Sequence, residues 1–366
     1  MSRRTSPLAG LLLALAPFAA TGAPPGAITI GNAEDLQAIP GSAWVLASSM
    51  RAADKPGGIY AISTASGSSQ RLFPTSPEAT ARPGANTAAD SRCPGEPGAD
   101  FAPHGIHLQS GPDGVSLHVV NHGNRESIEI FSIAAEGDDP PTLNWTDCVP
   151  LPPGTQANSV AAAGDGTLYA TAAGAVFDAT APAAGTAGPG DIPASGILAW
   201  QPQSGWRIVA DKLALSNGLL ISTDNRFLYA AEWLGRQIVE IDLGDPRHQR
   251  RLAVDFAPDN LRWADEGAFW VAGQATTVEE VMACYLSDRN HCGLDSALAL
   301  IDSATLSALC HQTIAATEEF GGATVALPVA DSLWIGTFRG DAILVGERAT
   351  ASGVNAECLH AGGAQP

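Results

Sequence analysis

One strand pattern recurs six times along this chain, and it constrains the fold more than any other feature. Each copy has a short apolar run, a turn, an aromatic-rich or branched run, a loop and a third run. The second runs, in order, are AWVLASS, VSLHVVNHG, GTLYATAA, RFLYAAEW, GAFWVAGQ and SLWIGTF. Most copies add a fourth run, and helical periodicity is almost absent. Four-stranded antiparallel units repeated around an axis are typical of β-propellers. The sequence therefore predicts an all-β, six-bladed propeller.

The sixth copy has no convincing fourth strand of its own. The segment AITI, at 27–30, precedes the first copy, and we expect it to pair with the last blade and close the ring. Residues 24–366 would then form one domain, since 45% of the residues are hydrophobic and can bury a large core. The topology puts the long inserts at 74–103, 175–196 and 274–296 on one face, where they can wall a pocket.

The N-terminus has the parts of a secretory signal. Arg3 and Arg4 precede the apolar run LAGLLLALAPFAA, and small residues follow up to Ala23. The apolar run is too short for a comfortable bilayer span, so we expect no stable membrane span after residues 1–23 are removed. All six cysteines lie in the mature part, and an even number in an exported chain favours disulfides. We expect an exported protein, periplasmic or extracellular.

The topology suggests one disulfide pairing among several that six cysteines allow. Cys93 precedes the inner strand of the second copy and Cys148 ends its outer strand, both toward the loop face. We expect these two to pair, with Cys284 and Cys292 closing the insert of the fifth copy. The remaining bond would join Cys310 to Cys358 near the tail.

The charge balance bears on partners. The chain has 19 basic and 38 acidic residues, a formal net charge of -19. Such a surface repels phosphate backbones and anionic lipid, so we expect no nucleic-acid partner, whereas divalent cations are attracted.

Polar residues stand where the first strand of each copy begins. These are Glu34-Asp35, His104, Asn158, Asn217, Asp259-Asn260 and Thr324. The first strand of a propeller blade lines the central channel, so these positions converge on the axis at one depth. Taken singly, each Asn or Asp is more typical of a turn or of the start of a strand. Together, carboxylate and amide oxygens suit Ca²⁺, and Glu34 and Asp259 would repel each other without a cation.

Two histidines lie at the same end of the second copy. His104 opens its inner strand and His122 closes the adjacent strand, so both reach the same face. A lone strand histidine is usually packed or exposed without a chemical role. A pair above a metal site is a candidate proton-transfer couple, with His104 as general base and His122 orienting it.

Several motifs together resemble the paraoxonase or arylesterase family. They are PHGI, VVNH, SNGLLISTDNRFLYAAEW, DNL before FWVAG, and GGATVALPVADSLWIGT, spread from about Ile28 to about Val345. That family comprises calcium-dependent six-bladed propellers that hydrolyse lactones and aryl esters, within a clan that includes gluconolactonase and regucalcin. The resemblance implies that the catalytic calcium is held by five residues, Glu34, Asn158, Asn217, Asp259 and Asn260. His104 and His122 match the family's histidine dyad.

The chain departs from this family at several positions. The resemblance implies a second calcium on Asp35 and the Ile106 carbonyl, but Ser159 stands where the family has a further aspartate, so this site would be weak. A histidine of the last blade is replaced by Arg339, and a Cys-His pair near the pocket by Gly273-Gln274. The first cysteine of the family's end-to-end disulfide is missing. Substrate preference therefore does not transfer.

The leading hypothesis is an exported calcium-dependent carboxylic ester hydrolase, a lactonase or arylesterase, acting on a small-molecule lactone or ester. A gluconolactonase-like sugar lactonase is one alternative. A propeller that binds a ligand without catalysis and keeps calcium as a structural ion is another, because this architecture serves both roles. No Gly-x-Ser-x-Gly elbow or phosphate loop supports serine-hydrolase or nucleotide chemistry.

Overall fold

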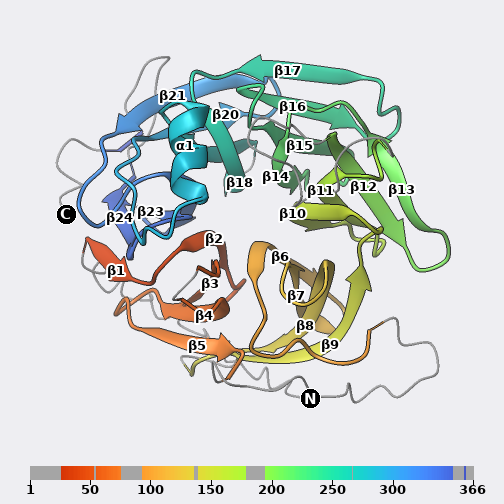
Figure 1. Ribbon diagram of the computed structural model, residues 1–366, viewed down its shortest axis with the longest axis horizontal. Coiled ribbons are helices and arrows are strands. Elements are labelled where there is room, and N and C mark those ends of the chain that lie inside the picture. The colour runs from red at the N-terminus through yellow and green to blue at the C-terminus, as the bar shows by residue number, and fades with distance from the viewer. Residues whose placement is uncertain are drawn as a thin grey trace, which may run out of the picture.

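Six four-stranded antiparallel sheets stand radially around a central axis (Figure 1). The computed structural model describes residues 26–52, 55–75, 93–135, 139–178, 194–265, 267–348 and 358–359. The six-bladed propeller predicted from the repeats is thus confirmed. The predicted signal at 1–23 lies outside the described residues, so its cleavage remains a prediction.

Each of the first five blades uses four consecutive strands, ordered from the axis outward. Blade 1 contains β2 (Ala33–Ala38), β3 (Trp44–Ser49), β4 (Gly58–Ser63) and β5 (Ser69–Phe73). Blade 2 contains β6 (Pro103–Gly111), β7 (Gly114–Asn121), β8 (Ser127–Ala134) and β9 (Thr142–Pro150). Blade 3 contains β10 (Thr155–Ala162), β11 (Leu168–Gly174), β12 (Ser195–Gln201) and β13 (Gly205–Ala210). Blade 4 contains β14 (Ser216–Ile221), β15 (Phe227–Glu232), β16 (Gln237–Asp242) and β17 (Gln249–Ala253). Blade 5 contains β18 (Ala257–Asp265), β19 (Ala268–Gln274), β20 (Ser296–Asp302) and β21 (Ser307–Ile314).

Blade 6 is completed by the other end of the chain. It contains β22 (Ala323–Val329), β23 (Ser332–Thr337) and β24 (Ala342–Glu347), and its outer strand is β1 (Ala27–Thr29). Ala27 pairs with Leu344 and Thr29 with Ala342, antiparallel. The closing role predicted for the N-terminal segment is therefore confirmed. This pairing ties the N-terminal segment, which leads into blade 1, to the last blade and so closes the ring.

The core is divided into clusters that lie between neighbouring blades. Leu46 and Ile59 of blade 1 pack with Ile106, Leu117 and Phe131 of blade 2, and all five side chains are fully buried. Comparable clusters fill the other five interfaces. A middle strand is thus covered on both faces, which explains why its residues read as continuous apolar runs and not as a strict alternation.

The inner strand of every blade carries an extra residue near its start relative to the strand beside it, and β18 has a second one between Trp263 and Asp265. The pairing shifts between Ala33 and Asp35, Pro103 and Ile106, Ala157 and Val160, Ser216 and Leu219, Pro258 and Leu261, and Ala323 and Val325. Such bulges bend a strand and redirect its side chains. All six fall on the polar positions that the sequence singles out, so the ring residues sit at irregularities in the ladder.

Two glycines let adjacent inner strands approach each other at this depth. A Cβ on Gly105 would lie 2.6 Å from the Asn158 carbonyl oxygen of the next blade. A Cβ on Gly218 would lie 2.2 Å from the Asp259 carbonyl oxygen. Asn217-Gly218 lies inside β14 and is not a hairpin turn. Glycine here serves close packing around the axis.

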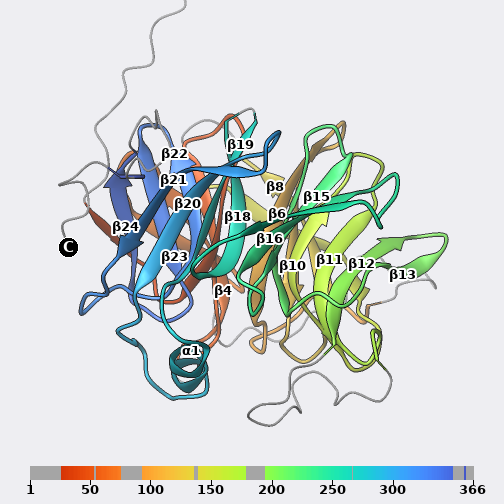
Figure 2. The same cartoon turned by 90° about the horizontal axis from the view of Figure 1, so that it is seen from above.

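One face of the propeller carries a helix, α1 (Val278–Tyr285), which projects beyond the strand ends (Figure 2). Thr277 caps it and Glu280 completes a capping box. The helix buries Val281 and Cys284 against a cluster that includes Phe338. It lies inside the predicted insert at 274–296. Its short length hid it from a search for periodicity, although the Thr-x-x-Glu signature was present.

The three disulfides are those predicted. Cys93 bonds to Cys148, Cys284 to Cys292, and Cys310 to Cys358. They are consistent with an exported protein. Among the described residues, none of the helices has the length and apolar character needed to cross a membrane.

Candidate metal and catalytic site

A cavity of about 470 Å³ opens on the face that carries α1. Its lining includes Arg51, His104, His122, Gln156, Tyr285 and Arg339. Beneath it lies the axial ring, because His104 Nε2 is 3.6 Å from Glu34 Oε1 and 3.5 Å from Asn158 Nδ2. The histidines therefore separate the cavity from the ring residues.

Five ring residues each present one side-chain oxygen that is buried and accepts no hydrogen bond from the described part of the chain. These atoms are Glu34 Oε2, Asn158 Oδ1, Asn217 Oδ1, Asp259 Oδ1 and Asn260 Oδ1. An unsatisfied buried acceptor costs about 1–3 kcal/mol, so native structures contain few of them. The five residues are the same ones that the family resemblance implies as calcium ligands.

Hydrogen bonds hold the other side-chain polar atoms of Glu34, Asp259 and Asn260. Asn260 Nδ2 donates to Glu34 Oε1 at 2.7 Å, and Gln274 Nε2 donates to Asp259 Oδ2 at 2.9 Å. Trp233 Nε1 in turn holds the Gln274 oxygen at 2.7 Å. These contacts fix the side chains while leaving one oxygen of each free. Gln274, part of the departure from the family, thus positions a ring carboxylate.

Thr324, the polar residue at the sixth position, is used differently. Its hydroxyl donates to the Glu34 backbone carbonyl at 2.6 Å. The ring therefore offers oxygens from four blades. Its donor set, two carboxylates and three amides, fits a hard cation that takes about six to eight oxygens. The described residues contain no cluster of three or more His, Cys, Asp or Glu suited to a metal, so an ion here would depend on amide oxygens.

Burial makes the ionised forms of the two ring carboxylates, Glu34 and Asp259, electrostatically unfavourable in the absence of a cation. Burial, together with Asp35 and Asp259, raises the pKa of Glu34 well above its ordinary value. Burial also raises the pKa of Asp259 to about 8, against the hydrogen bond from Gln274. A cation between them would favour the ionised forms.

The two predicted histidines are in contact and continue into a hydrogen-bonded chain. His104 Nδ1 lies 3.0 Å from His122 Nε2, and His122 Nδ1 lies 2.8 Å from Glu126 Oε2. Gln156 Nε2 donates to the other Glu126 oxygen at 2.8 Å. Burial and His122 lower the pKa of His104 to about 3, so its imidazole is neutral. Glu126 was missed from the sequence, although its position four residues after His122 was visible.

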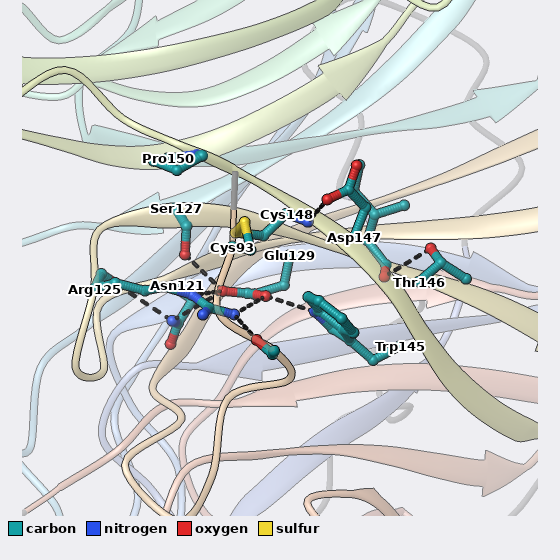
Figure 3. Close-up of a disulfide and its surroundings, with 12 residues drawn as sticks. Cys93, Asn121, Arg125, Ser127, Glu129, Trp145, Thr146, Asp147, Cys148 and Pro150 are labelled. Atoms are coloured by element: carbon teal, nitrogen blue, oxygen red, sulfur yellow. Dashed lines mark hydrogen bonds and ion pairs between the residues drawn. A yellow bond between two sulfur atoms is a disulfide. The ribbon is translucent and has the colours of Figure 1, made fainter. Parts of the chain in front are cut away.

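A buried carboxylate supports the loop that carries His122 and Glu126 (Figure 3). Glu129 is fully buried and accepts hydrogen bonds from Arg125 at 2.7 and 2.8 Å, from Ser127 at 2.7 Å and from Trp145 at 2.7 Å. Arg125 Nη2 also donates to the Gly95 carbonyl at 2.8 Å, close to the Cys93–Cys148 bond. The network joins two loops at the cavity.

The candidate second calcium site contains a guanidinium. Asp35 and Ile106 are brought together, since the Ile106 amide donates to Asp35 Oδ2 at 2.8 Å. Arg262 pairs with Asp35 Oδ1 and donates to the Ile106 carbonyl at 3.2 Å and the Leu36 carbonyl at 2.8 Å. The Ser159 hydroxyl is buried without a hydrogen-bond partner in the described chain. Arg262 was not identified from the sequence.

Comparison with known proteins agrees with this architecture. Residues 124–282 match the family model described as SMP-30/Gluconolactonase/LRE-like region. A luciferin-regenerating enzyme superposes with a TM-score of 0.53 at 14% identity, over 91% of this chain and 96% of that one. A calcium-binding protein, regucalcin, from Agrobacterium tumefaciens gives 0.51 at 11% identity, over 92% and 98%. A putative gluconolactonase gives 0.50 at 16%, over 91% and 96%. No curated protein matches by sequence.

Proposed function

We propose that this protein is an exported, calcium-dependent hydrolase of lactones. The observation that carries the proposal is the set of five buried ring oxygens without hydrogen-bond partners, directly below a histidine pair that faces a cavity. The family match at 124–282 supports lactonase or calcium-binding chemistry, because the matched family is described as gluconolactonase-like.

Glu34, Asn158, Asn217, Asp259 and Asn260 would hold the ion. Bound there, calcium supplies a positive charge that stabilises negative charge developing on a substrate carbonyl oxygen.

The hydrogen-bonded chain sets where protons sit. Glu126, acting as acceptor, fixes the proton of His122 on Nδ1, which leaves His122 Nε2 as an acceptor. His104 then carries its proton on Nδ1, and its Nε2 presents a lone pair toward the ring. His104 Nε2 would take a proton from the attacking water as the water oxygen bonds to the acyl carbon, and His122 with Glu126 would stabilise the imidazolium formed. The imidazolium would then give that proton to the alkoxide oxygen released when the acyl C–O bond of the lactone breaks.

Aryl esters are a second substrate class that the same reaction would hydrolyse. They share the acyl carbonyl of lactones, and the paraoxonase-like motifs quoted above favour them. Sugar lactones are favoured equally by the gluconolactonase-like family match. The two differ in the leaving group and not in the residues required.

The test is hydrolysis of a panel of aliphatic lactones, sugar lactones and aryl esters with calcium and with chelator. We expect turnover of lactones that chelator abolishes. Asn217→Ala, which removes one ring oxygen, should abolish turnover and lower the melting temperature. Asn144→Ala, on the exposed side of β9, is the matched control and should change neither. A protein that binds calcium yet hydrolyses no member of the panel would be a binding propeller with a structural ion.

A further inference from the structure

Arg339 is a buried cation on the cavity wall with no anionic partner among the described residues. Its side chain is only 8% exposed, and it follows β23 on the face that carries α1. Its Nη2 donates to the Tyr285 carbonyl at 3.3 Å. Its Nε and Nη1 find no acceptor anywhere in the described part of the chain. Two donors of a permanently charged fork are therefore left over beside the cavity.

The other buried arginine of the described chain, and one that is partly buried, are paired with carboxylates. Arg262 pairs with Asp35, and Arg125 pairs with Glu129 at 2.7 Å. Leaving a buried charge unpaired is strongly unfavourable, and this chain has twice as many acidic as basic residues from which a partner could come. The absence of an ion pair at Arg339 among the described residues indicates that its partner arrives with a ligand.

We propose that Arg339 binds an anionic group of the substrate, so that the preferred substrates are lactones or esters that carry a carboxylate. The reaction in this statement rests on the function proposed above, whereas the anion site stands on Arg339 itself. A carboxylate accepts charge-assisted hydrogen bonds from guanidinium N–H groups, and Nε and Nη1 of Arg339 have no acceptor in the described part of the chain.

Three features of the cavity agree with an anionic substrate. Arg51 lies on the same lining with a side chain 46% exposed and bonded to Asp100, so a second positive charge stands at the opening. The protein as a whole has a formal net charge of -19, whereas Arg339 and Arg51 place positive charge at this cavity. That local positive charge can attract an anion. Arg339 and His104 line the same cavity of about 470 Å³, so one small molecule can reach both.

The first experiment compares two γ-lactones that differ only in a substituent, one a carboxylate and the other a carboxamide of equal size. We expect the wild type to prefer the carboxylate. Arg339→Gln should lower kcat/KM for the carboxylate lactone by roughly 10- to 100-fold, the effect of losing charge-assisted hydrogen bonds, and leave the carboxamide lactone within about twofold. Arg339→Lys should recover part of the loss.

The matched control is Arg226→Gln, since Arg226 is exposed, pairs with Asp242 and lies in a turn on the other face. It should leave both substrates unchanged. Equal losses on both lactones in Arg339→Gln, or no loss, would overturn the anion site while the lactonase function stood.

A second experiment measures binding without reaction. Tetrahydrofuran-2-carboxylate and its carboxamide cannot be hydrolysed as lactones, and calorimetry in excess calcium gives their affinities for the wild type and Arg339→Gln, each checked by its melting temperature. We expect the carboxylate probe to bind well to the wild type and not to Arg339→Gln. The carboxamide probe should bind well to neither protein. If neither lactone is turned over but this binding pattern holds, the hydrolase proposal fails and the anion site stands. If the carboxylate probe still binds Arg339→Gln but no longer binds once chelator is added, the probe binds the metal ion and the proposal is overturned. Equal binding of the two probes would also overturn it.

Discussion

A single carboxylate can set the proton positions of two imidazoles in this protein. Glu126 touches His122 at 2.8 Å, and His122 touches His104 at 3.0 Å. Each contact decides which nitrogen of the next imidazole carries a proton. The effect of Glu126 therefore extends to His104 Nε2, which lies beside the axial ring residue Glu34. In the proposed reaction, Glu126 would position the pair without contacting the reacting atoms.

Replacing Glu126 by Gln should test this chain of hydrogen bonds. The amide can donate to His122, which permits the wrong tautomer, so we expect kcat to fall by roughly 100-fold with little change in melting temperature. Nitrogen NMR shifts of the His122 ring should report the altered tautomer. Glu279→Gln, on the exposed side of α1, is the control. A normal kcat in Glu126→Gln would show that the pair needs no orienting carboxylate.

A second histidine pair bears on the pH dependence of stability. His118 is 4% exposed, and burial lowers its pKa to about 4. The pKa of this histidine in the unfolded chain is near 6.5. The folded protein, in which His118 is neutral, therefore keeps its full stability above that pH and loses stability as the pH falls from about 6.5 toward 4. The loss at pH 5 is roughly 2 kcal/mol for this group.

We therefore expect His118→Leu to reduce the acid sensitivity of the fold. The difference in unfolding free energy between pH 7.5 and pH 5, measured by denaturant titration at fixed calcium, should shrink by about 2 kcal/mol. His248→Leu, at an exposed position, should leave it unchanged. His118 lies across from His107, whose pKa is lowered to about 3 by burial, His118 and Arg262, so part of the sensitivity will remain. An undiminished difference would rule out His118 as its source.

At the scale of elements, the bulge of each inner strand and the loops above it build the site. The bulges turn polar side chains toward the axis, and residues of two inserts, among them Ala102 and Tyr285, line the cavity above them. The insert with α1 is packed through Val281 and Cys284, and its Tyr285 carbonyl holds Arg339. Site geometry here comes from irregular backbone that a regular propeller supports.

This division explains what the sequence could and could not predict. Blade number, ring closure by 27–30 and the disulfide pairs followed from repeats and topology, which depend on local patterns. The positions of the ring residues followed from their register in those repeats. Arg262 and Glu126 were missed because their partners, Asp35 and His122, become informative only when packing places the side chains together. No local pattern distinguishes an arginine that pairs with a carboxylate from one, such as Arg339, that has no such partner in the described part of the chain.

The disulfides should contribute unequally to stability. Cys93 and Cys148 are separated by 55 positions, and Cys284 and Cys292 by 8. Loop-closure entropy gives about 4 kcal/mol for the first bond and about 2.5 kcal/mol for the second. Replacing Cys93 and Cys148 by Ala should therefore lower the free energy of unfolding more than replacing Cys284 and Cys292, as denaturant titration would show. The opposite order would mean that strain or residual structure outweighs chain entropy at these bonds.

At the scale of the whole molecule, the ring ties together blades that are far apart in the sequence. Glu34 lies in blade 1, Asn158 in blade 3, Asn217 in blade 4, and Asp259 in blade 5. The apolar clusters join each blade only to its neighbours, so an ion held by all four would add a contact across the axis. Two residues of β18 already make such connections to β2, Arg262 to Asp35 and Asn260 to Glu34.

Metal content and melting together test this view of the molecule. We expect near one tightly bound calcium per chain after dialysis against calcium-free buffer, because the Arg262 guanidinium lies where the second ion would need the Asp35 carboxylate and the Ile106 carbonyl. An ion that binds only the folded ring adds about 2.7 kcal/mol to the free energy of unfolding at a free concentration of 100 times its Kd, so chelator should lower the temperature of the main unfolding transition.

Arg262→Met leaves Asp35 buried and unpaired, and should lower the melting temperature sharply in chelator. If the variant then regains stability with added calcium and binds a second ion, the guanidinium has been standing in for a cation. Two tightly held ions in the wild type, or melting unaffected by chelator, would contradict this account of the ring.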